Sequence, residues 1–344
     1  MRVAWLGIAL GALCACTGAV DDGDGPDRSG PGSGSGSGSG SNEPPAGAGP
    51  YFQTPMFWNR DVSGEAKAAT SDATIAALRS AGGWGNNDKM QIDFSITVLA
   101  ADAATPMKTF TPTDEFYSPD CDETAVPVPA NGSLEGESGY ACTTGGDCHL
   151  IVHDPSSSKL YEMWRADMTS GFQGGCLAVW STATTYTDTL RGDQCTSADA
   201  AGFPIAPLLF TADEVAAGEI AHAIRFILPN NRVRRGYVRP ATHGTATTGG
   251  PDAPAYGVHF RLRADYPIDS LPAGARVVAR AMQKYGMYHA DGGNIALTAA
   301  SDRFTTAKWD GLLEPQDLAA LRVEDFEVID EGSMITLTYD CARN

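Results

Sequence analysis

Alternating apolar residues predict several strands in this chain. Residues 91–99 alternate cleanly between apolar and polar side chains, and residues 177–180 predict a shorter strand. Residues 218–264 predict the order strand, turn, strand, loop, strand. The residues that would share a strand face in this stretch are Ile220, His222, Ile224 and Phe226 in the first strand and Val258, Phe260 and Leu262 in the last.

A hairpin is predicted for residues 148–166, with a four-residue loop at 155–158. If Asp154 pairs with Lys159, Ile151 lies opposite Glu162. One face would then be the core face, formed by Leu150, Val152, Tyr161 and Met163. The other face would carry His149, Glu162 and Trp164, either as a corner of a functional site or as a solvated surface.

Four short helices complete the predicted elements. They cover residues 72–81, 212–217, 275–285 and 315–321, and the second begins with a capping box of Thr211 and Glu214. A closing strand is predicted at residues 334–339. Short strands with frequent turns and few helices indicate a mainly β fold, a β-sandwich or jelly-roll-like single domain.

The N-terminal segment predicts export and lipidation. Residues 1–15 have the basic start and apolar run of a secretory signal peptide, too short to span a bilayer. The sequence Leu-Cys-Ala-Cys at 13–16 resembles a bacterial lipoprotein signal, which makes Cys16 the lipidation site. Residues 16–50 then form an Asp-, Gly-, Ser- and Pro-rich tether, and residues 51–344 the globular β-rich domain. We therefore expect a lipid-anchored protein of the cell envelope, at the outer membrane.

Six cysteines remain in the predicted globular domain, and an even number in an exported protein predicts three disulfides. They are Cys121, Cys142, Cys148, Cys176, Cys195 and Cys341. Proximity along the chain suggests the pairs Cys121–Cys142 and Cys176–Cys195, which leaves Cys148 for Cys341. Zinc binding is disfavoured because the chain has no Cys-x-x-Cys pair.

Charge is distributed unevenly in this acidic chain. The formal net charge is -18 and the pI about 4.6, which argues against nucleic acid as a partner. Residues 218–264 nevertheless hold seven of the 24 basic residues and three of the six histidines. Between Arg225 and Arg263 the only acidic residue is Asp252. This basic, histidine-bearing stretch is the strongest functional lead in the sequence.

Several sequence motifs resemble a family of secreted bacterial β-rich domains. The matching segments are residues 58–63, 147–154, 160–162, 196–202, 213–226, 240–243, 261–264, 284–287 and 290–292. The resemblance implies an exported β-rich domain, often joined to carbohydrate-binding or immunoglobulin-like modules. It implies no particular reaction.

The predicted function is action on extracellular polysaccharide, without a cofactor. For a lyase of acidic glycans, Arg239, Arg261 and Arg263 would bind the sugar carboxylate, because arginine suits planar bidentate recognition. His243 would be the base and Tyr285 (or Tyr237) the acid. The alternative for these arginines is pairing with surface carboxylates. For a hydrolase, the candidate carboxyl groups are Glu162, Glu219 and Asp291.

Further candidates broaden the possible functions. His149 and Glu162 could be catalytic, and Trp164 and Asp291 could bind substrate. A metal-dependent enzyme is a further alternative if His149, His222 and His243 converge. A non-catalytic binding or adhesion module would use tryptophans that stack on sugar rings, namely Trp58, Trp84, Trp164, Trp180 and Trp309. The chain has no phosphate loop, nucleophile elbow or dinucleotide fingerprint.

Overall fold

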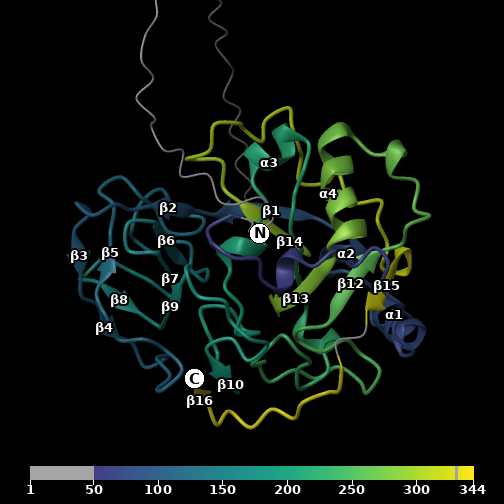
Figure 1. Ribbon diagram of the computed structural model, residues 1–344, viewed down its shortest axis with the longest axis horizontal. Coiled ribbons are helices and arrows are strands. Elements are labelled where there is room, and N and C mark those ends of the chain that lie inside the picture. Colours follow the sequence, from purple (N-terminus) through teal and green to yellow (C-terminus); the bar gives the residue numbers. More distant parts are fainter. Residues whose placement is uncertain (1–49, 330–331) are drawn as a thin grey trace, which may run out of the picture. The chain divides into compact units, whose positions relative to one another are not determined.

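The computed structural model describes residues 50–329 and 332–344, which all belong to the unit Glu43–Asn344. Strands make up most of the regular structure, and short helices the rest (Figure 1). No helix within these two ranges is long and apolar enough to cross a bilayer. The predictions for the signal peptide, for Cys16 and for nearly all of the tether concern residues outside the described ranges.

The predicted hairpin forms the middle of a four-stranded sheet. Strand β6 (Leu150–Asp154) pairs antiparallel with β7 (Lys159–Trp164), with Asp154 opposite Lys159 and Ile151 opposite Glu162, as predicted. Strand β9 (Cys176–Ser181) pairs with β7, and β2 (Val98–Ala100) runs parallel to β6. The four strands lie in the order β2-β6-β7-β9.

Both faces of this sheet are buried. Leu150, Val152 and Met163 belong to a smaller core on one side, as the alternation predicts. Ile151, Leu160 and Trp180 on the other side belong to the main core. The face that carries Glu162 is therefore not a solvated surface, because its apolar residues pack against the rest of the domain.

A second, six-stranded sheet contains most of the main core. It has the order β1-β14-β11-β13-β12-β15, formed by Ile92–Ile96, Leu297–Ala300, Ile224–Leu228, Met287–Gly292, His259–Leu262 and Phe326–Ile329. The pairs β1/β14 and β11/β13 are parallel. This mixed sheet does not confirm a jelly roll, which is built from antiparallel strands. Only Thr97 separates β1 from β2, so the chain passes directly from one sheet to the other (Figure 1).

Four helices accompany the sheets in residues 50–329 and 332–344. They are α1 (Ser71–Ser80), which packs against β15, α2 (Gly85–Asp88), α3 (Ala212–Ala217) and α4 (Ala273–Lys284). Helix α3 begins with the predicted capping box. Helix α4 ends before Gly286, whose φ is 71°. A Cβ at Gly286 would lie 2.4 Å from His259 Nε2, so only glycine fits this turn into β13.

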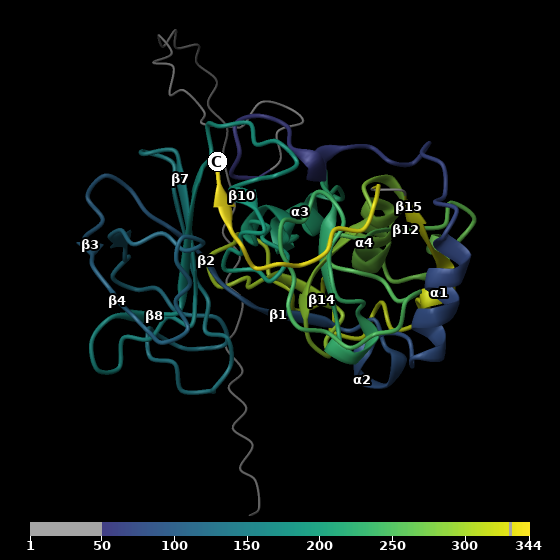
Figure 2. The same cartoon turned by 90° about the horizontal axis from the view of Figure 1, so that it is seen from below.

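Short elements complete the domain. The two-residue strands are β3 (Met107–Lys108), β4 (Thr111–Pro112), β5 (Val126–Pro127), β8 (Gln173–Gly174), β10 (Gly192–Asp193) and β16 (Ala342–Arg343). They pair as β3/β5, β4/β8 and β10/β16. Figure 2 shows β16, at the C-terminus, beside β10. The 3-10 turns are Phe57–Asn59, Ala206–Leu208, Asn230–Arg232, Ile268–Ser270 and Val323–Asp325.

Three predicted elements differ from the structure. Residues 218–264 contain two strands, β11 and β12, and the predicted middle strand is irregular chain. Residues 315–321 form turns without a helix. In residues 334–339 only Ile335 forms a β-bridge, with Tyr237. In each case a short apolar pattern fits several conformations, and long-range packing selects among them.

The disulfides pair differently from the prediction. They are Cys121–Cys176, Cys142–Cys148 and Cys195–Cys341. All three pairs inferred from proximity are wrong, although the six cysteines do form three disulfides. Proximity failed because sheet formation brings together residues far apart in sequence, up to 146 positions for Cys195 and Cys341.

Candidate functional site

One cavity of about 660 Å³ combines carboxyl groups, aromatic rings and a histidine. Ligand sites in proteins are commonly concave, with apolar walls and a few polar groups. The charged and aromatic residues that line this one are Asp120, Asp147, Asp199, Asp291, His243, Tyr117, Trp164, Tyr256 and Tyr339. No lysine or arginine is among its lining residues. This cavity is the candidate functional site.

All three disulfides lie next to residues that line the cavity. Asp120 precedes Cys121, Asp147 precedes Cys148, and Thr196 follows Cys195. Cys176 lines the cavity itself, and Tyr339 lies two residues before Cys341. The covalent cross-links therefore brace the wall of the site, most of which is irregular chain.

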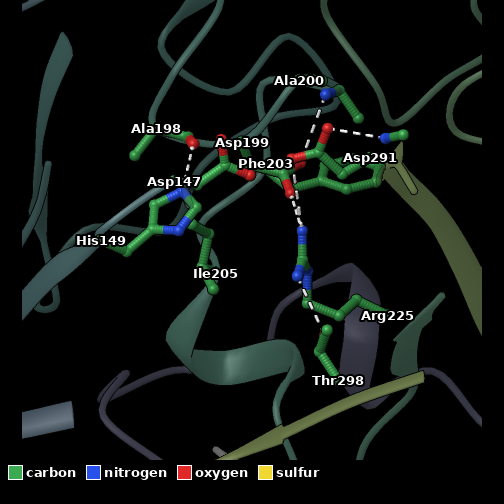
Figure 3. A network of polar contacts seen from close by, with 12 residues as sticks. Asp147, His149, Ala198, Asp199, Ala200, Phe203, Ile205, Arg225, Asp291 and Thr298 are labelled. Carbon is green, nitrogen blue, oxygen red and sulfur yellow. Dashed lines mark hydrogen bonds and ion pairs between the residues drawn. The ribbon is translucent and has the colours of Figure 1, made fainter. Parts of the chain in front are cut away.

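Figure 3 shows a network of ion pairs that includes Asp199 and Asp291, which line the cavity. Arg225, on β11, places Nη2 2.5 Å from Asp199 Oδ1 and 3.7 Å from Asp291 Oδ2. Its Nη1 donates to Thr298 Oγ1 on β14, at 2.9 Å. Figure 3 shows Asp199 and Asp291 on the same side of Arg225, with Thr298 on the other. Two carboxyl groups thus share one guanidinium nitrogen.

The two carboxyl groups of this network differ in exposure. The Asp199 side chain is fully buried, and burial raises its pKa to about 7, although Arg225 opposes this shift. The Asp291 side chain is 26% exposed and can contact a ligand. Burial also raises the pKa of Asp291, against the opposing effect of Arg225, and nearby Asp147 adds to the increase. Asp291 is therefore an accessible group suited to donating a proton.

Asp147 and Trp164 form one wall of the cavity. The indole Nε1–H of Trp164 donates to Asp147 Oδ1 at 3.0 Å, which fixes the orientation of the ring. Asp147 is exposed and Trp164 half-buried. An oriented indole beside a carboxylate is a suitable surface for a sugar ring.

His243 has one ring nitrogen engaged. Its Nδ1 lies 2.9 Å from the carbonyl oxygen of Ala200, and donation to this acceptor places the proton on Nδ1. Burial lowers the pKa of His243, so the ring is neutral at pH 7. Among the described residues Nε2 has no hydrogen-bond partner, and in this tautomer it can accept a hydrogen bond or a proton.

His149 and Glu162 are structural groups below the surface of the site. His149 lies 2.6 Å from Glu135 Oε2 through Nδ1 and 3.1 Å from the Ala198 carbonyl through Nε2. Burial opposes its charged form, but Glu135 outweighs this effect and raises the pKa of His149 to about 9.

Glu162 has no exposed surface and accepts from the backbone N–H groups of Ile205 and Ala206 and from Trp180 Nε1. Burial raises its pKa to about 7, although these donors favour the ionised form. Neither His149 nor Glu162 lines the cavity, so a catalytic role in contact with substrate does not fit either residue.

The predicted arginine site is not assembled. Arg239 pairs with Asp193 at 2.9 Å, Arg261 with Glu327 at 2.6 Å and Arg263 with Asp265 at 3.2 Å. Tyr285 is buried at the end of α4, with Lys284 Nζ 4.9 Å from its ring centroid. None of these four predicted residues lines the cavity. Each of the three arginines instead pairs with a carboxylate outside the cavity, which is the alternative that the sequence left open.

No shared metal site emerges from the predicted histidines. His222 is buried, with both ring nitrogens engaged by the Ala223 carbonyl and by Glu214. Within residues 50–329 and 332–344, the only suitable cluster of three ligand atoms is Glu137, Cys142 and Cys148. Because those cysteines are joined in a disulfide, their sulfur atoms cannot act as thiolate ligands.

The structure brings together three of the predicted site residues, His243, Trp164 and Asp291. Trp58, Trp84, Trp180 and Trp309 are buried in the core, so Trp164 alone of the five predicted tryptophans lines the cavity. Sequence reasoning did not assign Asp120, Asp147 and Asp199 to the site. A signal existed for Asp147 and Asp199, because the segments 147–154, 196–202, 240–243 and 290–292, which carry the family resemblance, all contribute to the cavity.

Comparison of the chain with models of protein families, with curated proteins and with solved structures finds no match. The resemblance inferred from the sequence motifs therefore stays a prediction, and the site is interpreted from its own geometry.

Proposed function

We propose that this protein is a cell-envelope lipoprotein that hydrolyses an extracellular polysaccharide in the described cavity. The observation that carries the proposal is the placement of the accessible Asp291, whose pKa is raised by burial, in the same cavity as the exposed Asp147 and the oriented ring of Trp164. Lipidation at Cys16 and the tether at residues 16–50 would hold the enzyme at the outer membrane, where such a substrate is accessible.

The chemistry follows from two carboxyl groups with different tasks. Asp291 donates its proton to the glycosidic oxygen as the bond from that oxygen to the anomeric carbon breaks. Asp147 accepts a proton from the water molecule that attacks the anomeric carbon, so that one bond is cleaved and one water is consumed. His243 Nε2 accepts a hydrogen bond from a sugar hydroxyl. The aromatic rings bind the sugar faces.

The lining residues favour hydrolysis over β-elimination of an acidic glycan. Elimination requires a cation that neutralises the sugar carboxylate. The three arginines expected to supply it pair elsewhere, and Arg225 is buried against Asp199. A uronic acid would also be repelled by the carboxyl groups of the cavity. We therefore propose a substrate without acidic groups, in place of the acidic glycan expected from sequence.

A glycan-binding module without catalysis is the second candidate. The observation that favours it is the exposure of two aromatic residues of the cavity, Tyr117 at 53% and Tyr339 at 45%. Exposed rings beside a cavity are sufficient to hold a sugar chain. This candidate predicts binding with no release of reducing ends.

The test uses the exported protein and a panel of neutral, amino and acidic polysaccharides. We expect new reducing ends from at least one non-acidic glycan, and we expect Asp291→Asn to lower kcat at least about 100-fold while binding persists. Because the pKa of Asp291 is raised, wild-type activity should decline as the pH rises through that pKa and Asp291 loses its proton.

Asp310→Asn provides the matched control, since Asp310 is exposed and does not line the cavity. Binding by the wild type without cleavage of any glycan would favour the non-catalytic module. Cleavage that survives Asp291→Asn unchanged would remove Asp291 as the proton donor.

A further inference from the structure

We propose that the glycan accepted by this cavity is positively charged, a polymer of amino sugars with free amino groups. The inference rests on the proposed function, because it concerns the substrate of the same site. It is carried by carboxylate oxygens without partners, by the absence of basic lining residues and by the aromatic rings beside them.

Asp120 provides the first of these oxygens. The residue is 8% exposed, and its Oδ2 accepts from the backbone N–H of Thr196 at 2.8 Å. Within the described part of the chain, Oδ1 has no hydrogen-bond partner, and no basic side chain forms an ion pair with Asp120. Oδ1 is therefore free to accept a hydrogen bond from a ligand in the cavity, and a positively charged donor would bind it most strongly.

Asp147 provides the second carboxylate oxygen without a partner. Trp164 Nε1 occupies Oδ1, while Oδ2 has no donor among the residues that the structure describes. An ammonium group carries three donors and a full positive charge, and it is also attracted to the face of an indole or phenol ring. The charge of Asp147 and the ring of Trp164 therefore both attract an amino group bound nearby at Asp120, while Asp147 Oδ2 stays available to the attacking water.

The charges of the lining residues favour an amino sugar over a neutral sugar as the ligand of the cavity. Aromatic rings and hydrogen bonds alone would suffice for a neutral sugar. In this cavity, however, the guanidinium of Arg225 is already bound by Asp199 and Thr298. No lining residue supplies a positive charge to the carboxylates of Asp120 and Asp147, although Arg191 and Arg343 donate to the backbone carbonyl oxygen of Asp120 from outside the lining. A cationic sugar would supply the missing charge.

The experiment compares each amino polysaccharide with its chemically N-acetylated form, which keeps the linkage and removes the charge. We expect the free-amine form to be hydrolysed with kcat/KM about tenfold higher. The advantage should shrink as sodium chloride increases, because salt screens the attraction. Asp120→Asn, which can still accept from Thr196, should reduce the advantage several-fold, whereas Asp310→Asn should preserve it.

Each outcome decides between the inference and the proposed function. Equal or faster hydrolysis of the N-acetylated or neutral glycans would overturn the inference and leave the hydrolase proposal intact. Hydrolysis of no glycan would overturn both. If Asp120→Asn does not fold, the salt dependence of the wild-type preference supplies the test, and a preference unaffected by salt would contradict the inference.

Discussion

Two charged regions of this protein behave in opposite ways. Residues 218–264 contain four arginines that lie close together in the sequence but form ion pairs with different carboxylates in the structure. They are Arg225, Arg239, Arg261 and Arg263. In the cavity, carboxylates from distant parts of the sequence come together, and neither Asp120 nor Asp147 has an ion-pair partner among the described residues. Charge density along a chain is therefore a weaker indicator of a site than charge left unpaired after folding.

Breaking the buried ion pair of Arg225 and Asp199 should have the largest effect on stability. Arg225→Met leaves Asp199 buried without its partner and should lower the free energy of unfolding by about 3–5 kcal/mol. Urea denaturation of the disulfide-intact protein measures the change. The double variant Arg225→Met with Asp199→Leu, which removes both charges, should recover most of the loss. A loss below about 1 kcal/mol for the single variant would show that the pair is not a structural support.

The His149–Glu135 pair should make stability depend on pH. The folded pKa of His149, about 9, lies above its ordinary 6.5, so this stabilisation is complete below about pH 6.5 and is lost as the pH rises through 9. Although burial opposes it, the imidazolium lowers the pKa of Glu135 to about 2, so the same pair weakens as the pH falls from 4.5 through 2.

The expected decrease between pH 6.5 and 9 is at most about 3 kcal/mol. Urea denaturation of the wild type and of His149→Gln across this range provides the measurement. The variant should show a flatter dependence, and parallel curves would refute the linkage.

The arginines of residues 218–264 that lie nearer the surface should have the smallest effects. Arg263 is 46% exposed and pairs with Asp265, and such pairs contribute about 0–1 kcal/mol. Arg263→Ala and Arg239→Ala should each leave kcat/KM on the preferred glycan within about twofold of the wild type, since neither residue lines the cavity. A loss of 100-fold would restore the arginine site that the sequence suggested; thermal denaturation would separate this from unfolding.

Local interactions account for the parts of the fold that the sequence predicted. The hairpin β6/β7 has the expected register because its short loop fixes the pairing, and Thr211 with Glu214 caps α3 within a single turn. The parallel pairs β1/β14 and β11/β13 and the partners of the six cysteines depend on contacts between distant segments. A one-dimensional pattern contains little information about such contacts.

The candidate site was predicted in part for the same reason. Trp164 and Asp291 were proposed because each is a residue type that binds sugars, and the structure brings both to one cavity. The arginines and Tyr285 were grouped by their nearness in sequence, yet strands that run to different partners separate them. Asp120 lies far in the chain from the other acidic residues of the cavity, and only folding places it near His243. Burial lowers the pKa of His243, and Asp120 partly opposes this shift.

The Cys195–Cys341 bond joins the C-terminal segment to the wall of the cavity. It links the segment of Tyr339, two residues before Cys341, to the segment of Thr196, and both residues line the cavity. Reduction would remove the covalent part of this support and leave the hydrogen bonds of Gln194 to Thr336 and Thr338 and the pairing of β10 with β16. The position of Tyr339 in the cavity wall therefore depends on the redox state of the preparation.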